Sequence, residues 1–245
     1  MAQAVSIVRV SRALEVLSSS RGEGMSLEEL AGTMEISRPA ALRLFESMVE
    51  TGIAVRTGAK RYRLSLKSYE WGVKALSIVG PSVTTRREMS RLATNIGHLV
   101  WYAVREDASV LAIEGVDFHD GDLLNFPVAL RKCWWRTASG TVIAAFSAPN
   151  VQRDLIAAID EQDSDHADHH ALLDLTRREG VAWQRHEGTG TGVAVPVLDS
   201  SGHASAAIGL TIQGFEGLDP LVQPLKEAAA RASDYLGYSQ TLLVT

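Results

Sequence analysis

The chain has 245 residues, enough for one large domain or two ordinary ones, and its 46% hydrophobic and 22% charged residues are typical of a folded globular protein. No apolar run reaches the roughly 18 residues that a membrane span requires, and the N-terminal sequence lacks the pattern of a secretory signal peptide. A single cysteine, Cys133, excludes an internal disulfide and a cysteine-rich zinc site. These features predict a cytoplasmic protein with no membrane partner.

The charge is unevenly distributed along the chain. The net charge is −5, yet residues 1–77 carry 11 Lys and Arg against 8 Asp and Glu, and residues 36–67 carry seven basic residues against two acidic ones. A basic segment in an acidic chain is expected of a small nucleic-acid-binding module joined to a second, non-binding domain. A solvated basic face explains the charge alone equally well.

Apolar periodicity and capping signals predict three helices before residue 52. The first contains Ile7 and Leu17 at helical spacing and ends at the turn cluster 18–22. Ser26 and Glu29 form a capping box that opens a short second helix over about 26–34. Residues 35–37 interrupt the helical pattern before the third helix.

The third helix and the segment after it complete a recognisable plan. The third helix begins near Arg38-Pro39, with the proline in its first turn, and ends at Gly52. Two short β-type runs, 53–56 and 62–64, follow with a basic glycine turn between them. This order is the winged helix-turn-helix plan. The second helix of that motif, here the third helix of the chain, enters the major groove of DNA. Small domains of this shape also mediate protein–protein contacts, so that alternative stays open.

The remaining residues predict a linker helix and a larger mixed domain. Residues 66–97 contain two helices separated by Gly80-Pro81, and the first is interpreted as the linker. Predicted strands cover 99–104, 110–116, 123–128, 193–198 and 206–212, and predicted helices cover 137–147, 150–160, 168–179 and a segment that starts at Asp219. This order predicts an α+β sandwich with an antiparallel sheet. We expect a DNA-binding domain over 1–66, a linker helix over 67–80 and a second domain over 81–245.

Three stretches of the sequence resemble the IclR (isocitrate lyase regulator) family of bacterial transcription factors. They are SRALEVLSSSRGEGMSLEELAGTMEISRPAALRLFESMVETGIAVRTGAKRYRLS, WWRTASGTVIAAF, and RREGVAWQRHEG with the following GVAVPVLDSSGHASAAIGLTI. The resemblance implies a winged helix-turn-helix domain, a linker helix and a GAF-like α/β sandwich that binds a small-molecule effector. It also implies dimers, often paired into tetramers, on palindromic operator DNA. Repression and activation both stay open, and no cofactor is expected.

The resemblance places Arg38, Ala40, Ala41 and Arg43 at the recognition-helix positions that face DNA. The arginines are candidates for phosphate or base contacts and the alanines for apolar contact with thymine methyl groups. Arg43 has a second interpretation as one partner of a helix salt bridge to a glutamate at 46 or 50. The full set of predicted DNA-binding residues is Ser26, Ser37, Arg38, Pro39, Ala40, Ala41, Arg43, Lys60 and Arg61.

The resemblance also implies an effector pocket beside the helix that opens at Thr137. Family members carry a His and a Lys in this segment, and both are absent here. A helix N-terminus favours an anionic group. Aromatic walls from Trp101 and three other tryptophans would suit an aromatic or bulky organic acid. Core packing is the alternative interpretation for each tryptophan. The full set of predicted effector-binding residues is Trp134, Trp135, Thr137, Ala138, Ser139, Trp183, Gln184, Gly192, Thr211 and Gln213.

Other sequence patterns give weaker evidence for a functional site. The stretch 163–170 is rich in Asp and His, with His166 and His170 at a zinc-site spacing, but a solvated acidic loop is favoured over a metal site. The run 188–192 lacks the ending of a phosphate-binding loop and is interpreted as a flexible pocket loop. No catalytic motif is present, so we do not expect an enzyme. A regulator whose second domain only oligomerises, and an enzyme with an appended DNA-binding domain, are the alternatives.

Overall fold

The computed structural model describes residues 2–20, 23–58, 60–119, 122–159, 168–186, 190–212 and 219–238. The chain forms two compact units, Met1–Ile78 and Val79–Thr245. No helix among the described residues is long and apolar enough to cross a membrane.

The N-terminal unit contains the predicted helices and hairpin. Its elements are α1 (Ala2–Ser19), β1 (Met25–Ser26), α2 (Leu27–Met34), α3 (Arg38–Glu50), β2 (Ala54–Arg56), β3 (Arg61–Leu64) and α4 (Lys67–Val79). The strands form an antiparallel sheet in the order β1-β3-β2. Phe45 of α3 and Tyr62 of β3 are fully buried at the centre of this unit, where their rings pack together.

Local signals determine where these helices begin and end. The predicted capping box is present: the Glu29 N–H donates to the Ser26 hydroxyl, and the Ser26 N–H donates to the Glu29 carboxylate at 2.7 Å. Helix α3 begins with Pro39 in its first turn and ends before Gly52, whose φ of +72° suits glycine. Leu17 of α1 is buried, whereas Ile7, which lies on the same predicted helix, is exposed.

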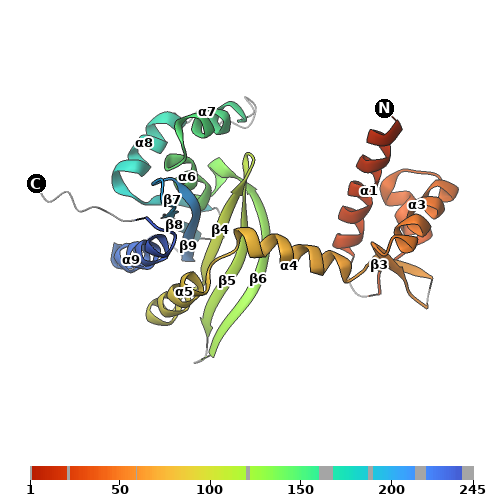
Figure 1. Cartoon of the computed structure of the whole chain (residues 1–245), viewed down its shortest axis with the longest axis horizontal. Helices are drawn as coiled ribbons and strands as arrows, with labels where there is room; N and C mark the ends of the chain where they lie inside the picture. Colours follow the sequence, from red (N-terminus) through yellow and green to blue (C-terminus); the bar gives the residue numbers. More distant parts are fainter. Residues whose placement is uncertain are drawn as a thin grey trace, which may run out of the picture. The chain divides into compact units, whose positions relative to one another are not determined.

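The C-terminal unit is built on one antiparallel sheet. Its strands are β4 (Val100–Glu106), β5 (Ser109–His119), β6 (Asp122–Cys133), β7 (Ala182–His186), β8 (Gly190–Leu198) and β9 (Ala204–Ile212), in the order β6-β5-β4-β9-β8-β7. Its helices are α5 (Val83–Ile96), α6 (Ala138–Ala145), α7 (Pro149–Ala157), α8 (His169–Glu179) and α9 (Asp219–Tyr235). Helices α5 and α9 cover one face, and α6, α7 and α8 lie on the other (Figure 1). The predicted α+β class is confirmed, but strand β7 was not predicted.

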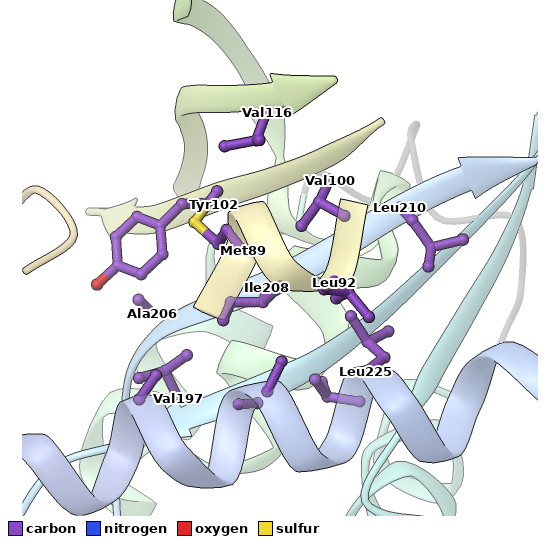
Figure 2. Packing of buried hydrophobic residues seen from close by; sticks show 14 of the residues in the cluster. Met89, Leu92, Val100, Tyr102, Val116, Val197, Ala206, Ile208, Leu210 and Leu225 are labelled. Carbon is purple, nitrogen blue, oxygen red and sulfur yellow. The ribbon is translucent and has the colours of Figure 1, made fainter. Parts of the chain in front are cut away.

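Large and small side chains are segregated to opposite faces of this sheet. Toward α5 and α9, the central strands carry Val, Ile and Leu side chains such as Val197, Ile208 and Leu210, packed against Met89 and Leu225 (Figure 2). Because side chains alternate along a strand, the intervening residues point toward α6. Many of these α6-facing residues are small, among them Ala103, Ala112, Gly192, Ala194, Ala207 and Gly209, although Trp101 and Val110 lie on the same face.

Helix α6 consists mainly of small residues, with Val142 and Ile143 as the exceptions, and is buried along its whole length. A 3-10 turn, Trp134–Arg136, precedes it, and the Trp134 side chain is fully buried with its indole N–H donating to the Leu155 carbonyl at 2.9 Å. Gly140 lies so close to this turn that a Cβ there would meet the Trp134 carbonyl oxygen at 2.1 Å. The contact between Gly140 and Trp134 therefore fixes where α6 begins.

Gly140→Ala should destabilise the C-terminal unit by about 1–3 kcal/mol, because the new methyl group would overlap rigid backbone atoms. Urea unfolding followed by tryptophan fluorescence and circular dichroism measures the change. Gly32→Ala in α2 is the control, since a Cβ there meets nothing within 4 Å and alanine is favoured inside a helix by roughly 0.5–1 kcal/mol. Wild-type stability in Gly140→Ala would contradict the close contact.

Candidate nucleic-acid interface and ligand cavity

The N-terminal end of α3 presents polar and small side chains to solvent. Ser37 occupies the N-cap position but makes no capping hydrogen bond, so its hydroxyl is available to another acceptor or donor. Pro39 is exposed and Ala40 is half-buried. In the first turn of α3, Pro39 has no N–H and the Ala40 N–H donates to the Ser37 carbonyl at 2.9 Å, so the N–H of Arg38 is the one left without a partner within the helix.

Arg38 lies at the start of α3 and forms an ion pair with Glu28 of α2. The Arg38 Nε donates to Glu28 Oε1 at 2.8 Å, and the two side chains are 67% and 65% exposed. The hydrogen bond from Arg38 lowers the pKa of the Glu28 carboxyl. Exposed pairs of this kind contribute little to stability, so a DNA phosphate can compete with Glu28 for the guanidinium.

Arg43 is exposed on α3, and no ion pair to it occurs among the described residues. The alternative helix salt bridge to residue 46 is not formed, because Glu46 accepts from the Tyr62 hydroxyl at 2.7 Å and from Arg56 at 3.3 Å. Arg43 lines a groove of about 730 Å³ between α1 and α3, which Arg9 lines as well. Two arginines thus face one groove beside the predicted recognition helix.

The remaining predicted DNA-binding residues have mixed roles. Ala41 is fully buried in the core, so the predicted apolar contact of Ala41 with DNA is wrong. Arg61 donates from Nε to the Gly24 carbonyl at 2.9 Å and pairs with Glu29 at 2.8 Å, which ties β3 to the start of α2. Ser26 is engaged in the capping box. Lys60 is exposed at the hairpin tip, with a positive φ of 56°.

The C-terminal unit contains a cavity of about 580 Å³ on the α6 face of the sheet. The first turn of α6 forms one wall, with Thr137, Ala138 and Ser139, and Gly192 of β8 and Thr211 of β9 contribute to the strand side. These five predicted effector-binding residues therefore line one cavity. The small residues on this face leave the space, because they do not fill the volume beside the first turn of α6.

Trp101 forms an aromatic wall of this cavity. It pairs with Gly209 across β4 and β9, and a Cβ on Gly209 would lie 2.7 Å from the Trp101 indole nitrogen. Glycine at this position therefore lets the indole lie close against the neighbouring strand. The rest of the strand wall is mainly apolar and includes Leu99, Val110 and Leu130.

The other three tryptophans that were predicted to contact the effector do not line the cavity. Trp134 is a core residue, Trp135 packs against the same core with its indole N–H buried and unpartnered, and Trp183 packs against the opposite face of the sheet. Packing directs the Trp134 ring into the core and strand register directs the Trp183 ring to the opposite face, and the effector contact predicted for Trp135 stays a prediction. Gln184 pairs with Gly192 but is not among the residues that line the cavity. Gln213 lies outside the described residues.

Sequence reasoning missed Lys132, which lines the cavity from β6. The predicted strand ended at residue 128, whereas β6 continues to Cys133. Alternation along the longer strand would have identified Lys132 as a neighbour of Val110, its partner on β5. The missing signal was the length of the strand, which its polar C-terminal end concealed.

Two further predictions concern segments near α8 and β8. Residues 160–167, which include most of the Asp- and His-rich stretch, lie outside the described residues, and the described part of the chain contains no cluster of potential metal ligands. Asp168 caps α8 by accepting from the Ala171 N–H. The run 188–192 is not wholly a loop, because β8 begins at Gly190 and Thr191 is buried in it.

The sequence is similar to that of known bacterial transcriptional regulators. Residues 73–234 match the model of the bacterial transcriptional regulator IclR C-terminal family. The helix-turn-helix-type transcriptional regulator KdgR of Dickeya chrysanthemi is 25% identical over 253 residues, which cover 95% of this chain and 80% of that protein.

Solved structures extend the similarity to the fold of the whole chain. IclR of Thermotoga maritima matches with a TM-score of 0.74 and 20% identity, covering 96% of this chain and 100% of that chain. An IclR homologue of Microbacterium hydrocarbonoxydans, complexed with 4-hydroxybenzoate, matches with a TM-score of 0.73, 24% identity and the same coverage. Because the family model covers more than half of the sequence, the chain belongs to the IclR family of bacterial transcriptional regulators.

Proposed function

We propose that this regulator binds operator DNA through its N-terminal unit and that a small organic effector in the α6 cavity modulates this binding. In this proposal residues 1–66 contact DNA, residues 67–80 form the linker and residues 81–245 bind the effector. The protein acts in the cytoplasm as a regulator without catalytic activity. The observation that carries the proposal is the presence of two solvent-exposed arginines on α3, Arg38 and Arg43, and a mainly apolar cavity of about 580 Å³ in one chain.

The DNA contacts are proposed for Ser37, Arg38, Pro39, Ala40 and Arg43. Arg43 supports this most directly, since its side chain is exposed and has no ion pair among the described residues. Arginine contacts phosphates as a fixed cation and also reads guanine in the major groove. The wing tip contributes Lys60 as a phosphate contact, whereas Arg61 and Ser26 hold the wing and α2 in position.

The effector is proposed to be a small organic acid with an apolar body, and aromatic acids are included in this class. The cavity is large enough for such a molecule and mainly apolar, which suits ligand binding. The complex of the Microbacterium homologue with 4-hydroxybenzoate supports a search among aromatic acids. A regulator whose second unit serves only oligomerisation would have no need of this cavity.

Self-association is proposed through α4, in which no residue is buried. Leu66, just before the helix, and Tyr69, Val73 and Leu76 recur at helical spacing and are exposed. An apolar stripe on an exposed helix favours pairing with another helix. Two copies joined in this way would present two recognition helices to successive major grooves of a palindromic operator.

Arg43→Ala should weaken binding to an operator selected from a random duplex pool and should reduce the salt slope of log K by about 1 if the contact is to phosphate. Arg38→Ala should weaken binding as well, because its exposed pair with Glu28 leaves the guanidinium free to exchange partners. Gel-shift titrations at several salt concentrations measure both effects. Arg153→Ala, which removes an exposed arginine from α7, is the control. Unchanged affinity in Arg43→Ala would remove this residue from the interface.

Organic acids should change the affinity of the protein for its operator. A coupling of about 5- to 150-fold is typical of such regulation. The operator complex is titrated with a panel that includes 4-hydroxybenzoate, and the apparent affinity is followed by fluorescence anisotropy. A panel in which no acid alters operator affinity would favour the ligand-independent regulator.

The double variant Val73→Glu with Leu76→Glu should shift the protein toward the monomer, because charged side chains disfavour an apolar helix pair. Sedimentation velocity measures the change in mass. Lys74→Glu places the same new carboxylate on the polar side of α4 and should leave the assembly intact. A double variant with the wild-type mass would exclude this stripe as the contact.

A further inference from the structure

The α6 cavity combines an apolar interior with one cationic side chain. Among the described residues that line the cavity, Lys132 has a charged side chain, and the others are apolar or uncharged. Lys132 is exposed as well as lining the cavity, which places it at the opening to solvent. A ligand that enters would therefore meet the ammonium group first and the apolar walls beyond it.

Strand register directs Lys132 into the cavity and its neighbour away from it. Lys132 pairs with Val110, and Leu130 pairs with Ala112, across β5 and β6. All four residues line the cavity. Arg131 lies between Leu130 and Lys132, so it points to the other face, where its guanidinium pairs with Glu106. Lys132 and Arg131 thus form a natural pair of test and control positions on one strand.

The first turn of α6 supplies donors to the same cavity. The Thr137 hydroxyl accepts from the Gly140 N–H at 2.9 Å, which leaves the N–H groups of Ala138 and Ser139 without a partner inside the helix. The Ser139 side chain is only 6% exposed, lines the cavity and makes no hydrogen bond among the described residues. Because Ser139 lines the cavity, its hydroxyl is open to a hydrogen bond with a polar group of a ligand.

These groups can neutralise one negative charge but not two. A carboxylate in apolar surroundings is costly unless it is paired and hydrogen-bonded. Lys132, the Ser139 hydroxyl and the free N–H groups at the start of α6 border the same cavity and can meet this requirement. A second carboxylate would find no second cation among the described residues that line the cavity.

We propose that Lys132 selects the effector by charge: the cavity binds a monocarboxylate with a flat apolar body and disfavours both the neutral amide and a dicarboxylate. This inference rests on the proposed function of the cavity. The flat shape follows from Trp101, whose indole lies against Gly209 and forms one wall. Lys132 is thus a specificity-determining residue, and the walls provide apolar contact that does not depend on charge.

The test uses the full-length protein and matched ligand pairs. Calorimetry and ligand-detected NMR compare 4-hydroxybenzoate, phenylacetate and cinnamate with their amides, and 4-hydroxybenzoate with terephthalate. The acids should bind about tenfold more tightly than the amides, the factor expected for one hydrogen bond to a charged group. Lys132→Gln should abolish this preference, Lys132→Arg should keep most of it, and Arg131→Gln should leave it unchanged.

Equal affinity for acids and amides in the wild-type protein would overturn the inference. A preference for acids over amides that survives in Lys132→Gln would also overturn it. So would the absence of binding by every acid at millimolar concentration. Tighter binding of terephthalate than of 4-hydroxybenzoate would overturn the limit of one charge. A separate measurement, the effect of each ligand on operator affinity, distinguishes failure of this inference from failure of the proposed function. Amides that bind as well as acids and still alter operator affinity would leave the effector function standing without charge selection by Lys132.

Discussion

The architecture of the C-terminal unit depends on the difference in side-chain size between the two faces of its sheet. On one face, branched residues such as Val195 and Ile208 fill the space beneath α5 and α9. On the other face, residues such as Ala194 and Gly209 allow α6 to approach closely but do not fill the volume beside its first turn. Branched side chains therefore fill one side, while the other side keeps a cavity between a helix N-terminus and five strands.

The functional groups of the cavity follow from this arrangement. Because α6 begins where Gly140 contacts the Trp134 turn, its unpaired N–H groups lie at the cavity wall. The same close packing lets Trp101 lie across Gly209. Lys132 reaches the opening because β6 continues past the residues that resemble a strand in sequence. A site for one anionic group and one flat apolar body thus results from backbone positions that the fold requires in any case.

Most of the elements were predictable from the sequence, whereas the direction of several side chains was not. Local signals such as the Ser26 capping box and Pro39 act within one turn of helix, so they can be recognised from neighbouring residues in the sequence. Strand β7, with the residues AWQRH, alternates too weakly to be recognised. Trp183 and Ala41 were assigned to functional surfaces, but strand register and helix packing bury or redirect them. These contacts depend on residues far away in the chain, which periodicity does not reveal.

Regulation requires a coupling free energy between effector binding in the cavity and operator binding at the DNA-binding face. This coupling free energy must be the same whether the effector or the operator binds first. Calorimetry of one acid effector, measured on the free protein and on the protein saturated with operator, tests this claim most directly. The account predicts that operator changes the effector affinity by the same factor by which the effector changes operator affinity, and that this factor differs from one. Identical effector affinities with and without operator would contradict it.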